Sequence, residues 1–179
     1  MFQLATPNLI IRDMRFSDEA DFVALSQDTK YQRFYEESDC TPEKYKELTH
    51  LFVEQSLETP RKAFQLAIEH KQSGQFIGIV CLRLEENQQA SMGCGMSREY
   101  QGSGLIKEAA LALVDYGFTT LKVHRIYAET ISKNRSAIKL CQSLGMRQEA
   151  HFKEHRFFKN QWWDTIVLAV LRSEWQELK

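Results

Sequence analysis

A short loop before a long helical pattern carries the residues best suited to chemistry in this chain. Residues 101–106 read QGSGLI, and the apolar residues that follow recur at helical spacing as far as Phe118. Glycines let successive backbone N–H groups turn toward one point, where the dipole of a helix start favours an anion. The loop therefore predicts a cradle for a pyrophosphate group, although a tight connection between two elements would use the same glycines.

Other glycine-rich phosphate motifs do not fit this loop. A dinucleotide-binding fingerprint needs a third glycine three residues after the second, but Arg98 and Lys107 stand at those positions. The Walker pattern is absent as well, since no Gly-Lys pair is followed by Ser or Thr. An unrelated nucleotide-binding protein is therefore the weakest of the alternatives.

Composition limits the class of protein. With 179 residues, 43% hydrophobic and 26% charged, the chain has the size of one globular domain over residues 1–179. A net charge of −1 provides no basic surface by count, so we expect no nucleic-acid partner. No signal peptide or bilayer-spanning run is evident, so we expect a cytoplasmic protein without a membrane partner. The four cysteines are scattered, and we expect no bound metal.

The elements that position the loop can be predicted from periodicity and capping. A strand over residues 9–14 precedes a helix over 17–25, and Thr41 with Pro42 begins a second helix that ends near residue 57. A period of two then predicts an antiparallel meander, with strands at 64–68, 76–84 and 90–96.

The chain after the loop alternates between helices and strands. We expect a strand at 125–131, a helix at 134–144 that ends at Gly145, and strands at 151–158 and 165–171 joined through 159–161. Together these elements predict an α+β fold around one central sheet.

Several segments of this sequence resemble one family. The pattern Gln101-x-x-Gly104-x-Ile106 is similar to the acetyl-coenzyme A motif of the GCN5-related N-acetyltransferase (GNAT) family. The strand before it and the helix that begins at Asn134 resemble that family's fourth strand and asparagine helix. The segments that carry the further likeness to the RimJ/RimL-like branch, which acetylates ribosomal-protein amino termini, are 124–129, 163–164 and Trp175.

The resemblance implies a mixed, mostly antiparallel sheet flanked by helices, in which the fourth and fifth strands splay apart around acetyl-CoA. It assigns acetyl-CoA contacts to the end of the fourth strand, to the glycine loop and to the asparagine helix. The implied residues are Gly95, Met96, Ser97, Gln101, Gly102, Ser103, Gly104, Leu105, Ile106, Asn134 and Ala137.

The resemblance also implies direct attack of a neutral amine on the thioester. A backbone N–H near Met96 would stabilise the oxyanion, and Glu129 is the remaining carboxylate near the acetyl position. Many relatives have Glu where this chain has Ser91, and Tyr where it has Cys141. The Cys141 thiol would donate the proton to the leaving thiolate or would simply fill apolar space, and Glu129 would be a base or a solvated surface charge.

The acceptor is less specified than the cofactor. At neutral pH an α-amine is roughly 10% neutral and a lysine below roughly 0.1%, so a site without a strong base favours an α-amine such as that of a protein or peptide amino terminus. A polyamine, amino sugar or amino acid is the alternative acceptor, and a non-catalytic acetyl-CoA-binding domain is the alternative function. If Glu36, Glu37 and Asp39 form an acceptor wall, a cationic acceptor is favoured.

Aromatic residues cluster near the carboxyl terminus. We interpret them as core and dimer packing rather than an acceptor groove, and a homodimer is one expected form. They are Phe152, Phe157, Phe158, Trp162 and Trp163.

Overall fold

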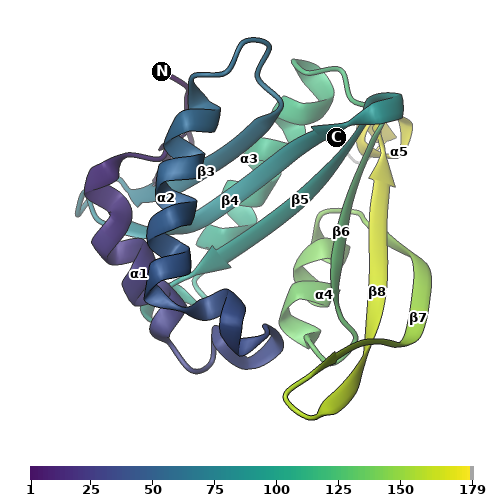
Figure 1. Cartoon of the computed structure of the whole chain (residues 1–179). Coiled ribbons are helices and arrows are strands. Elements are labelled where there is room, and N and C mark those ends of the chain that lie inside the picture. The colour runs from purple at the N-terminus through teal and green to yellow at the C-terminus, as the bar shows by residue number, and fades with distance from the viewer. Residues whose placement is uncertain (178–179) are drawn as a thin grey trace.

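The computed structural model describes residues 1–177, in which eight strands form one sheet in the order β1-β2-β3-β4-β5-β6-β8-β7 (Figure 1). All neighbouring strands are antiparallel except β5 and β6, which are parallel. The strands are β1 (Gln3–Ala5), β2 (Leu9–Asp13), β3 (Ala63–His70), β4 (Phe76–Glu85), β5 (Gln89–Met96), β6 (Arg125–Ile131), β7 (Arg147–Phe158) and β8 (Gln161–Leu171).

The helices cover both faces of the sheet. In Figure 1, α1 (Glu19–Gln27) and α2 (Pro42–Ser56) lie in front of it, and α3 (Leu105–Thr119) and α4 (Arg135–Ser143) lie behind. A short α5 (Arg172–Glu177) follows β8. Single turns of 3-10 helix fill the connections, at Phe16–Asp18, Gln32–Phe34, Glu37–Cys40, Glu86–Gln88 and Arg98–Tyr100.

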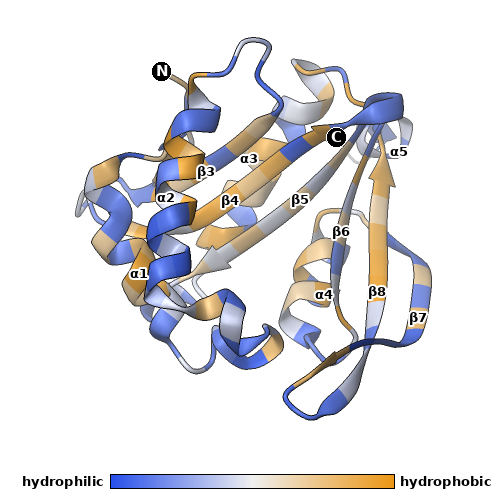
Figure 2. Cartoon of the chain, viewed as in Figure 1, coloured by the Kyte–Doolittle hydropathy of each residue, from blue (hydrophilic) through white to orange (hydrophobic). Residues whose placement is uncertain are grey.

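Each face of the sheet has its own apolar cluster. The larger cluster lies against α3 and includes Leu113 with Leu66 and Leu82 of the sheet, all fully buried. The smaller cluster joins α1 and α2 to the sheet through Phe22 and Phe52. In Figure 2, β4 and much of β8 are hydrophobic, whereas much of α2 is hydrophilic. No helix among residues 1–177 is both long and apolar enough to cross a bilayer.

The parallel pair is incomplete. Strands β5 and β6 pair only at Gln89 with Arg125, Ala90 with Ile126, and Ser91 with Tyr127. Beyond Ser91 the two strands diverge, and Figure 1 shows the widening gap between them. These are the strands that the resemblance counts as fourth and fifth, because the short β1 precedes the first strand predicted from sequence. The α+β class and the splayed pair are confirmed.

The two strands predicted near the carboxyl terminus were too short, because both observed strands begin earlier. Strand β7 begins at Arg147 and β8 at Gln161, so the hairpin turn is only Lys159 and Asn160. Both turn residues have positive φ, +50° and +55°, as a two-residue hairpin turn of this kind requires. Gly145 adopts φ +79° after α4, which confirms its predicted role at the helix end. The helix α5 was not predicted.

Candidate active site

The glycine loop connects β5 to α3 and places its glycines in left-handed conformations. Gly102 has φ +79°, and Gly104, the residue at the N-terminal cap of α3, has φ +85°. A Cβ atom built on either glycine would meet nothing within 4 Å. Glycine is therefore required by the backbone conformation at these positions, and space beside them stays open.

Several amides of this loop are unpaired. The Leu105 N–H reaches only the Ser103 hydroxyl, at 3.4 Å, and Gly104 provides no side-chain cap for α3. Among the described residues, no hydrogen bond is donated by the amides of Gly102, Ser103, Gly104, Ile106 and Lys107. Unpaired N–H groups at the start of a 15-residue helix fit the pyrophosphate of acetyl-CoA. Leu105 and Ile106 pack their side chains against the core instead of the loop.

Strand β5 presents unpaired peptide groups to the gap beside β6. Ser97 donates its N–H to the carbonyl of Ile77 on the β4 side at 2.8 Å. Because such bonds alternate along an antiparallel pair, the peptide groups of Gly95 and Ser97 are directed at β4, whereas those of Cys94 and Met96 face β6. Strand β6 has diverged at this level, so its ladder does not satisfy them.

The side chain of Gln101 links the loop to the strand. Its Nε2 donates to the carbonyl of Met96 at 3.2 Å. This bond uses the outward-facing carbonyl of Met96 and leaves its N–H available at the point where the resemblance expects the oxyanion. Gln101 thus holds the end of β5 against the loop.

The helix that follows Asn134 begins where it was predicted, and the Asn134 side chain caps its first turn. Asn134 accepts a hydrogen bond at Oδ1 from the backbone N–H of Ala137, at 3.3 Å, and so caps α4. The Ala137 amide is therefore occupied by the cap. The Asn134 Nδ2 donates to no group among the described residues, and Asn134 lines the cavity between the splayed strands.

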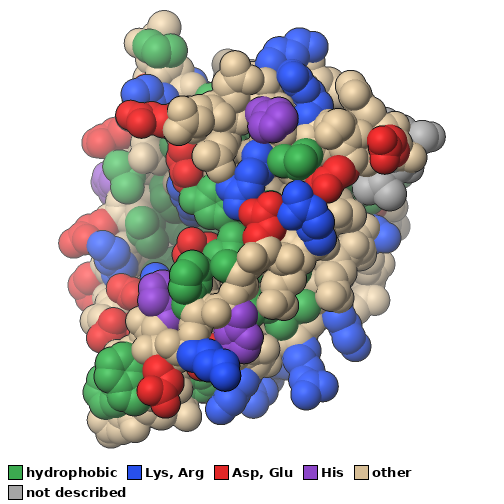
Figure 3. Space-filling view, turned by 90° about the vertical axis from the view of Figure 1, so that its right-hand side faces the viewer, with side chains coloured by type: hydrophobic (Ala, Val, Ile, Leu, Met, Phe, Trp, Pro, Cys, Tyr) green, Lys and Arg blue, Asp and Glu red, His purple; other side chains and the backbone are tan. Residues whose placement is uncertain are grey.

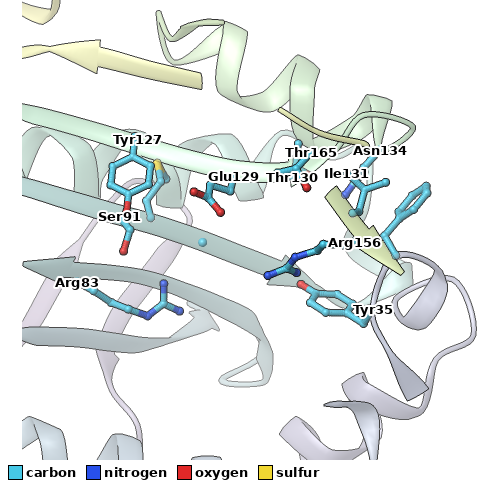
Figure 4. Close-up of a pocket in the computed structure, with 13 residues that line it drawn as sticks. Tyr35, Arg83, Ser91, Tyr127, Glu129, Thr130, Ile131, Asn134, Arg156 and Thr165 are labelled. Atoms are coloured by element: carbon cyan, nitrogen blue, oxygen red, sulfur yellow. The ribbon is translucent and has the colours of Figure 1, made fainter. Parts of the chain in front are cut away.

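A cavity of about 490 Å³ opens between β5 and β6 on the face that carries α1 and α2 (Figure 4). The alternation of side chains places Ser91 and Gly93 of β5, and Tyr127 and Glu129 of β6, toward this face. The cavity is lined by Phe34, Tyr35, Arg83, Ser91, Met92, Gly93, Tyr127, Glu129, Thr130, Ile131, Asn134, Arg156 and Thr165.

The two ionisable groups from β6 differ in their partners. The Tyr127 hydroxyl donates to the carboxylate of Glu85 at 3.0 Å, and the Arg125 guanidinium lies over its ring at 4.7 Å. Glu129 is exposed to the cavity and accepts no hydrogen bond among the described residues. Glu129 is therefore the carboxylate of this cavity that is free to act on a ligand.

Two thiols approach the gap from the α3 side. Burial raises the pKa of Cys141 to about 11. Burial, with a smaller contribution from the neighbouring Cys141, raises the pKa of Cys94 to about 12. Both thiols are protonated at neutral pH, so they can donate a proton but do not supply a thiolate nucleophile.

A tyrosine cluster between α1 and α2 was not predicted from sequence. The ring of Tyr31 lies so close to Gly95 that a Cβ there would be 2.7 Å from its Cε2 atom. Tyr45 donates to the Tyr31 hydroxyl at 3.1 Å, and Tyr35 stacks on the Tyr31 ring. Burial raises the pKa of Tyr31 well above its ordinary value, so this hydroxyl also stays protonated. The aromatic spacing in residues 31–35 was the only signal available in the sequence.

The acceptor wall differs from the prediction. The acidic residues Glu36, Glu37 and Asp39 are not among those that line the cavity. The cavity is lined instead by Phe34 and Tyr35 from this segment. The physical reason is local, since the backbone turns into the 3-10 helix Glu37–Cys40 and buries Cys40 there.

The carboxyl-terminal aromatics separate into two groups. Phe158 and Trp163 stack on each other and are buried with Ile131, as core packing predicts. Phe152, Phe157 and Trp162 are 48%, 57% and 56% exposed. Figure 3, seen from the β7–β8 side, shows hydrophobic side chains among charged residues and histidines on this surface.

Comparisons with known proteins agree with this geometry. The model of the family described as Acetyltransferase (GNAT) domain matches residues 8–147. The chain is 28% identical over 173 residues to the uncharacterized N-acetyltransferase YnaD of Bacillus subtilis, covering 96% of this chain and 98% of that protein.

Two further relatives have named acceptors. The [ribosomal protein uS5]-alanine N-acetyltransferase of Escherichia coli is 30% identical over 84 residues, which cover 47% of this chain and 43% of that protein. A solved structure of the spermidine N-acetyltransferase of Vibrio cholerae, in complex with CoA and spermine, has the same fold at a TM-score of 0.81 and 23% identity. That match covers 96% of this chain and 99% of the other.

Proposed function

This chain belongs to the GNAT acetyltransferase family, as an acetyl-CoA-dependent acyltransferase, and from that premise we propose that its acceptor is a primary α-amine. The observation that supports acetyl transfer at this site is the divergence of β5 and β6 beyond Ser91, whereas the α-amine preference depends on the supply of neutral amine. The divergence leaves the peptide groups of Cys94 and Met96 open between the glycine loop on the α3 face and a cavity on the α1–α2 face. The two substrates would meet there from opposite faces of the sheet.

The proposed reaction is a direct transfer. The lone pair of the neutral amine attacks the thioester carbonyl carbon, an N–C bond forms, and the C–S bond breaks. The amine nitrogen loses a proton, the departing thiolate gains one, and the products are the N-acetylated acceptor and coenzyme A. The Met96 N–H is positioned to stabilise the negative charge that develops on the carbonyl oxygen.

We assign the two proton transfers of the reaction to two side chains, a carboxylate that accepts a proton and a thiol that donates one. Glu129 is the free carboxylate in the cavity, and we assign it removal of the amine proton, directly or through water. Cys141 is buried and protonated, and we assign it protonation of the leaving thiolate. The pyrophosphate would be held by the unpaired amides of the glycine loop and of the start of α3, at Gly102, Ser103, Gly104, Ile106 and Lys107.

The α-amine preference follows from the supply of neutral nucleophile. Among the described residues that line the cavity, Glu129 is the one carboxylate and no histidine accompanies it, so an acceptor that is already neutral in solution is favoured. An α-amine is neutral about 100 times more often than a lysine at this pH, which is worth about 3 kcal/mol. A polyamine resembles lysine in this respect and also meets two arginines in the cavity.

The test compares two amines in one molecule. A short peptide with a free amino terminus and one lysine is incubated with acetyl-CoA, and kcat/KM is compared with that of the same peptide with a blocked amino terminus. We expect blocking to lower kcat/KM at least about tenfold. Equal rates, or faster transfer to spermidine than to any α-amine, would contradict the proposal. Acetyl-CoA binding without turnover of any amine would indicate a non-catalytic domain.

A further inference from the structure

The cavity contains two arginines without carboxylate partners. The buried or half-buried Arg12, Arg61 and Arg125 form ion pairs with Asp18, Asp13 and Glu149, whereas Arg83 and Arg156 are exposed at the cavity. Arg83 and Arg156 form no ion pair and no side-chain hydrogen bond among residues 1–177, yet both line the cavity. Guanidinium groups left free in a ligand cavity are suited to an anion.

The two arginines come from opposite sides of the splayed strands. Arg83 lies on β4 opposite Ser91, and a Cβ on Gly93 would be 3.9 Å from both of its terminal nitrogens. Its guanidinium therefore lies across the bare backbone of Gly93. Arg156 comes from β7, on the other half of the sheet. Figure 4 shows both side chains among the residues that line the cavity, together with Glu129.

The cavity is lined by more basic side chains than acidic ones. Glu129 is the one carboxylate among the lining residues that the structure describes, against two guanidinium groups. The nearby Glu85 accepts a hydrogen bond from the Tyr127 hydroxyl. An acceptor with several positive charges and no negative one would oppose two guanidinium groups at once, whereas an acceptor with one amine and one carboxylate would offer the carboxylate to the guanidinium groups and the amine to Glu129.

We propose that the acceptor is an amine that also carries a carboxylate, which Arg83 and Arg156 bind while Glu129 faces the amine. This inference rests on the proposed acetyl transfer to an amine and names the class of that acceptor. Two sources supply the same chemistry: the α-carboxylate of a free amino acid, and an acidic side chain at the start of a peptide. Both place a carboxylate a few bonds from an α-amine, within the reach of a cavity of about 490 Å³.

The experiment uses matched acceptors that differ only in the acid. One arm compares a free amino acid with its carboxamide, and the other compares peptides that begin with Asp or Asn. We expect the acid to have a kcat/KM about 10 to 100 times that of its amide in at least one arm. Whichever arm shows the ratio identifies the source of the carboxylate.

Substitutions test whether the two arginines cause the difference in kcat/KM between acid and amide. In Arg83→Gln and Arg156→Gln, the acid-to-amide ratio should fall toward one, whereas Arg172→Gln on α5, outside the cavity, should retain the wild-type ratio. Stabilisation by acetyl-CoA should persist in all three variants, which shows that they are folded and bind the co-substrate.

The outcomes separate the two proposals. Equal turnover of acid and amide in both arms, or an unchanged ratio in both cavity variants, would overturn the carboxylate inference while the acetyl transfer stands. Turnover of spermidine above that of every acid would overturn it as well. Absence of turnover with every amine would contradict the proposed function itself.

Discussion

At the scale of single residues, the site depends on the backbone conformation of a glycine and on the burial of a thiol. Gly104 holds a left-handed conformation at the start of α3, and burial raises the pKa of the Cys141 thiol to about 11. Both conditions are local, and each can be altered by one substitution.

The loop conformation gives a prediction with a matched control. Gly104 and Gly74 both have positive φ, +85° and +69°, and both have open space around a built Cβ. Gly104→Val and Gly74→Val should therefore each destabilise the fold by a similar amount, about 1 to 2 kcal/mol. Only Gly104→Val should weaken acetyl-CoA binding, as measured by calorimetric titration. Equal affinity in the two variants would remove the loop amides from the site.

The buried thiols predict a loss of stability at high pH. Burial raises the folded-state pKa of Cys141 and Cys81 to about 11 each, above the ordinary value of 9.0. Below pH 9 these thiols are neutral in both states and have no effect on the pH dependence. Between about pH 9 and 11 the unfolded chain releases their protons and the folded chain does not, so the free energy of unfolding falls.

Chemical denaturation at pH 8 and pH 10 measures this effect. The decrease in the free energy of unfolding between the two pH values should be smaller in Cys141→Ala than in the wild type. A decrease of the same size in both proteins would indicate that Cys141 ionises normally in the folded state.

At the scale of elements, the segment that follows α1 packs closely on β5 because Gly95 has no side chain. Tyr31 occupies the space that a side chain at position 95 would need, whereas a side chain at position 93 would meet only the end of Arg83, at 3.9 Å. The close packing of this segment on β5 therefore requires glycine at position 95 but not at position 93.

Two alanine substitutions test this packing. Gly95→Ala should displace Tyr31 and lower the free energy of unfolding by about 1 to 3 kcal/mol, because the contact at 2.7 Å cannot be kept. Gly93→Ala places its methyl group at an ordinary contact distance and should change stability by less than about 1 kcal/mol. Thermal or urea denaturation compares the pair, and equal stabilities would show that Tyr31 does not constrain position 95.

The elements themselves were largely predictable from the sequence. The three-strand meander, the glycine loop, α3 and the cap at Asn134 all depend on short-range patterns, and they were predicted close to their observed positions. The short β1 and the true start of β8 were missed, because neither has a clear alternation of apolar residues. The lining of the cavity was missed for a different reason. Arg83 and Arg156 are separated by more than 70 residues in sequence, and no local pattern brings them together.

At the scale of the whole molecule, the sheet consists of two halves joined by few pairs. Strands β1 to β5 form one half and β6 to β8 the other, and only the pairs from Gln89 to Ser91 connect them through β5 and β6. The glycine loop of residues 101–106 lies at the open end of β5, and the arginines of the cavity come from both halves. A co-substrate and an acceptor that meet in this gap would bridge the two halves, so we expect acetyl-CoA to raise the thermal unfolding temperature; at 100 times its Kd it would add about 2.7 kcal/mol.

The most direct test of the central claim is to locate the transferred group. The protein is incubated with acetyl-CoA labelled in the acetyl group and with a peptide that has a free amino terminus and one lysine, and the product is fragmented in a mass spectrometer. The account predicts the label on the α-nitrogen, one coenzyme A thiol released for each label, and little label on the lysine. Label on the lysine alone, or no label while acetyl-CoA still stabilises the protein, would contradict it.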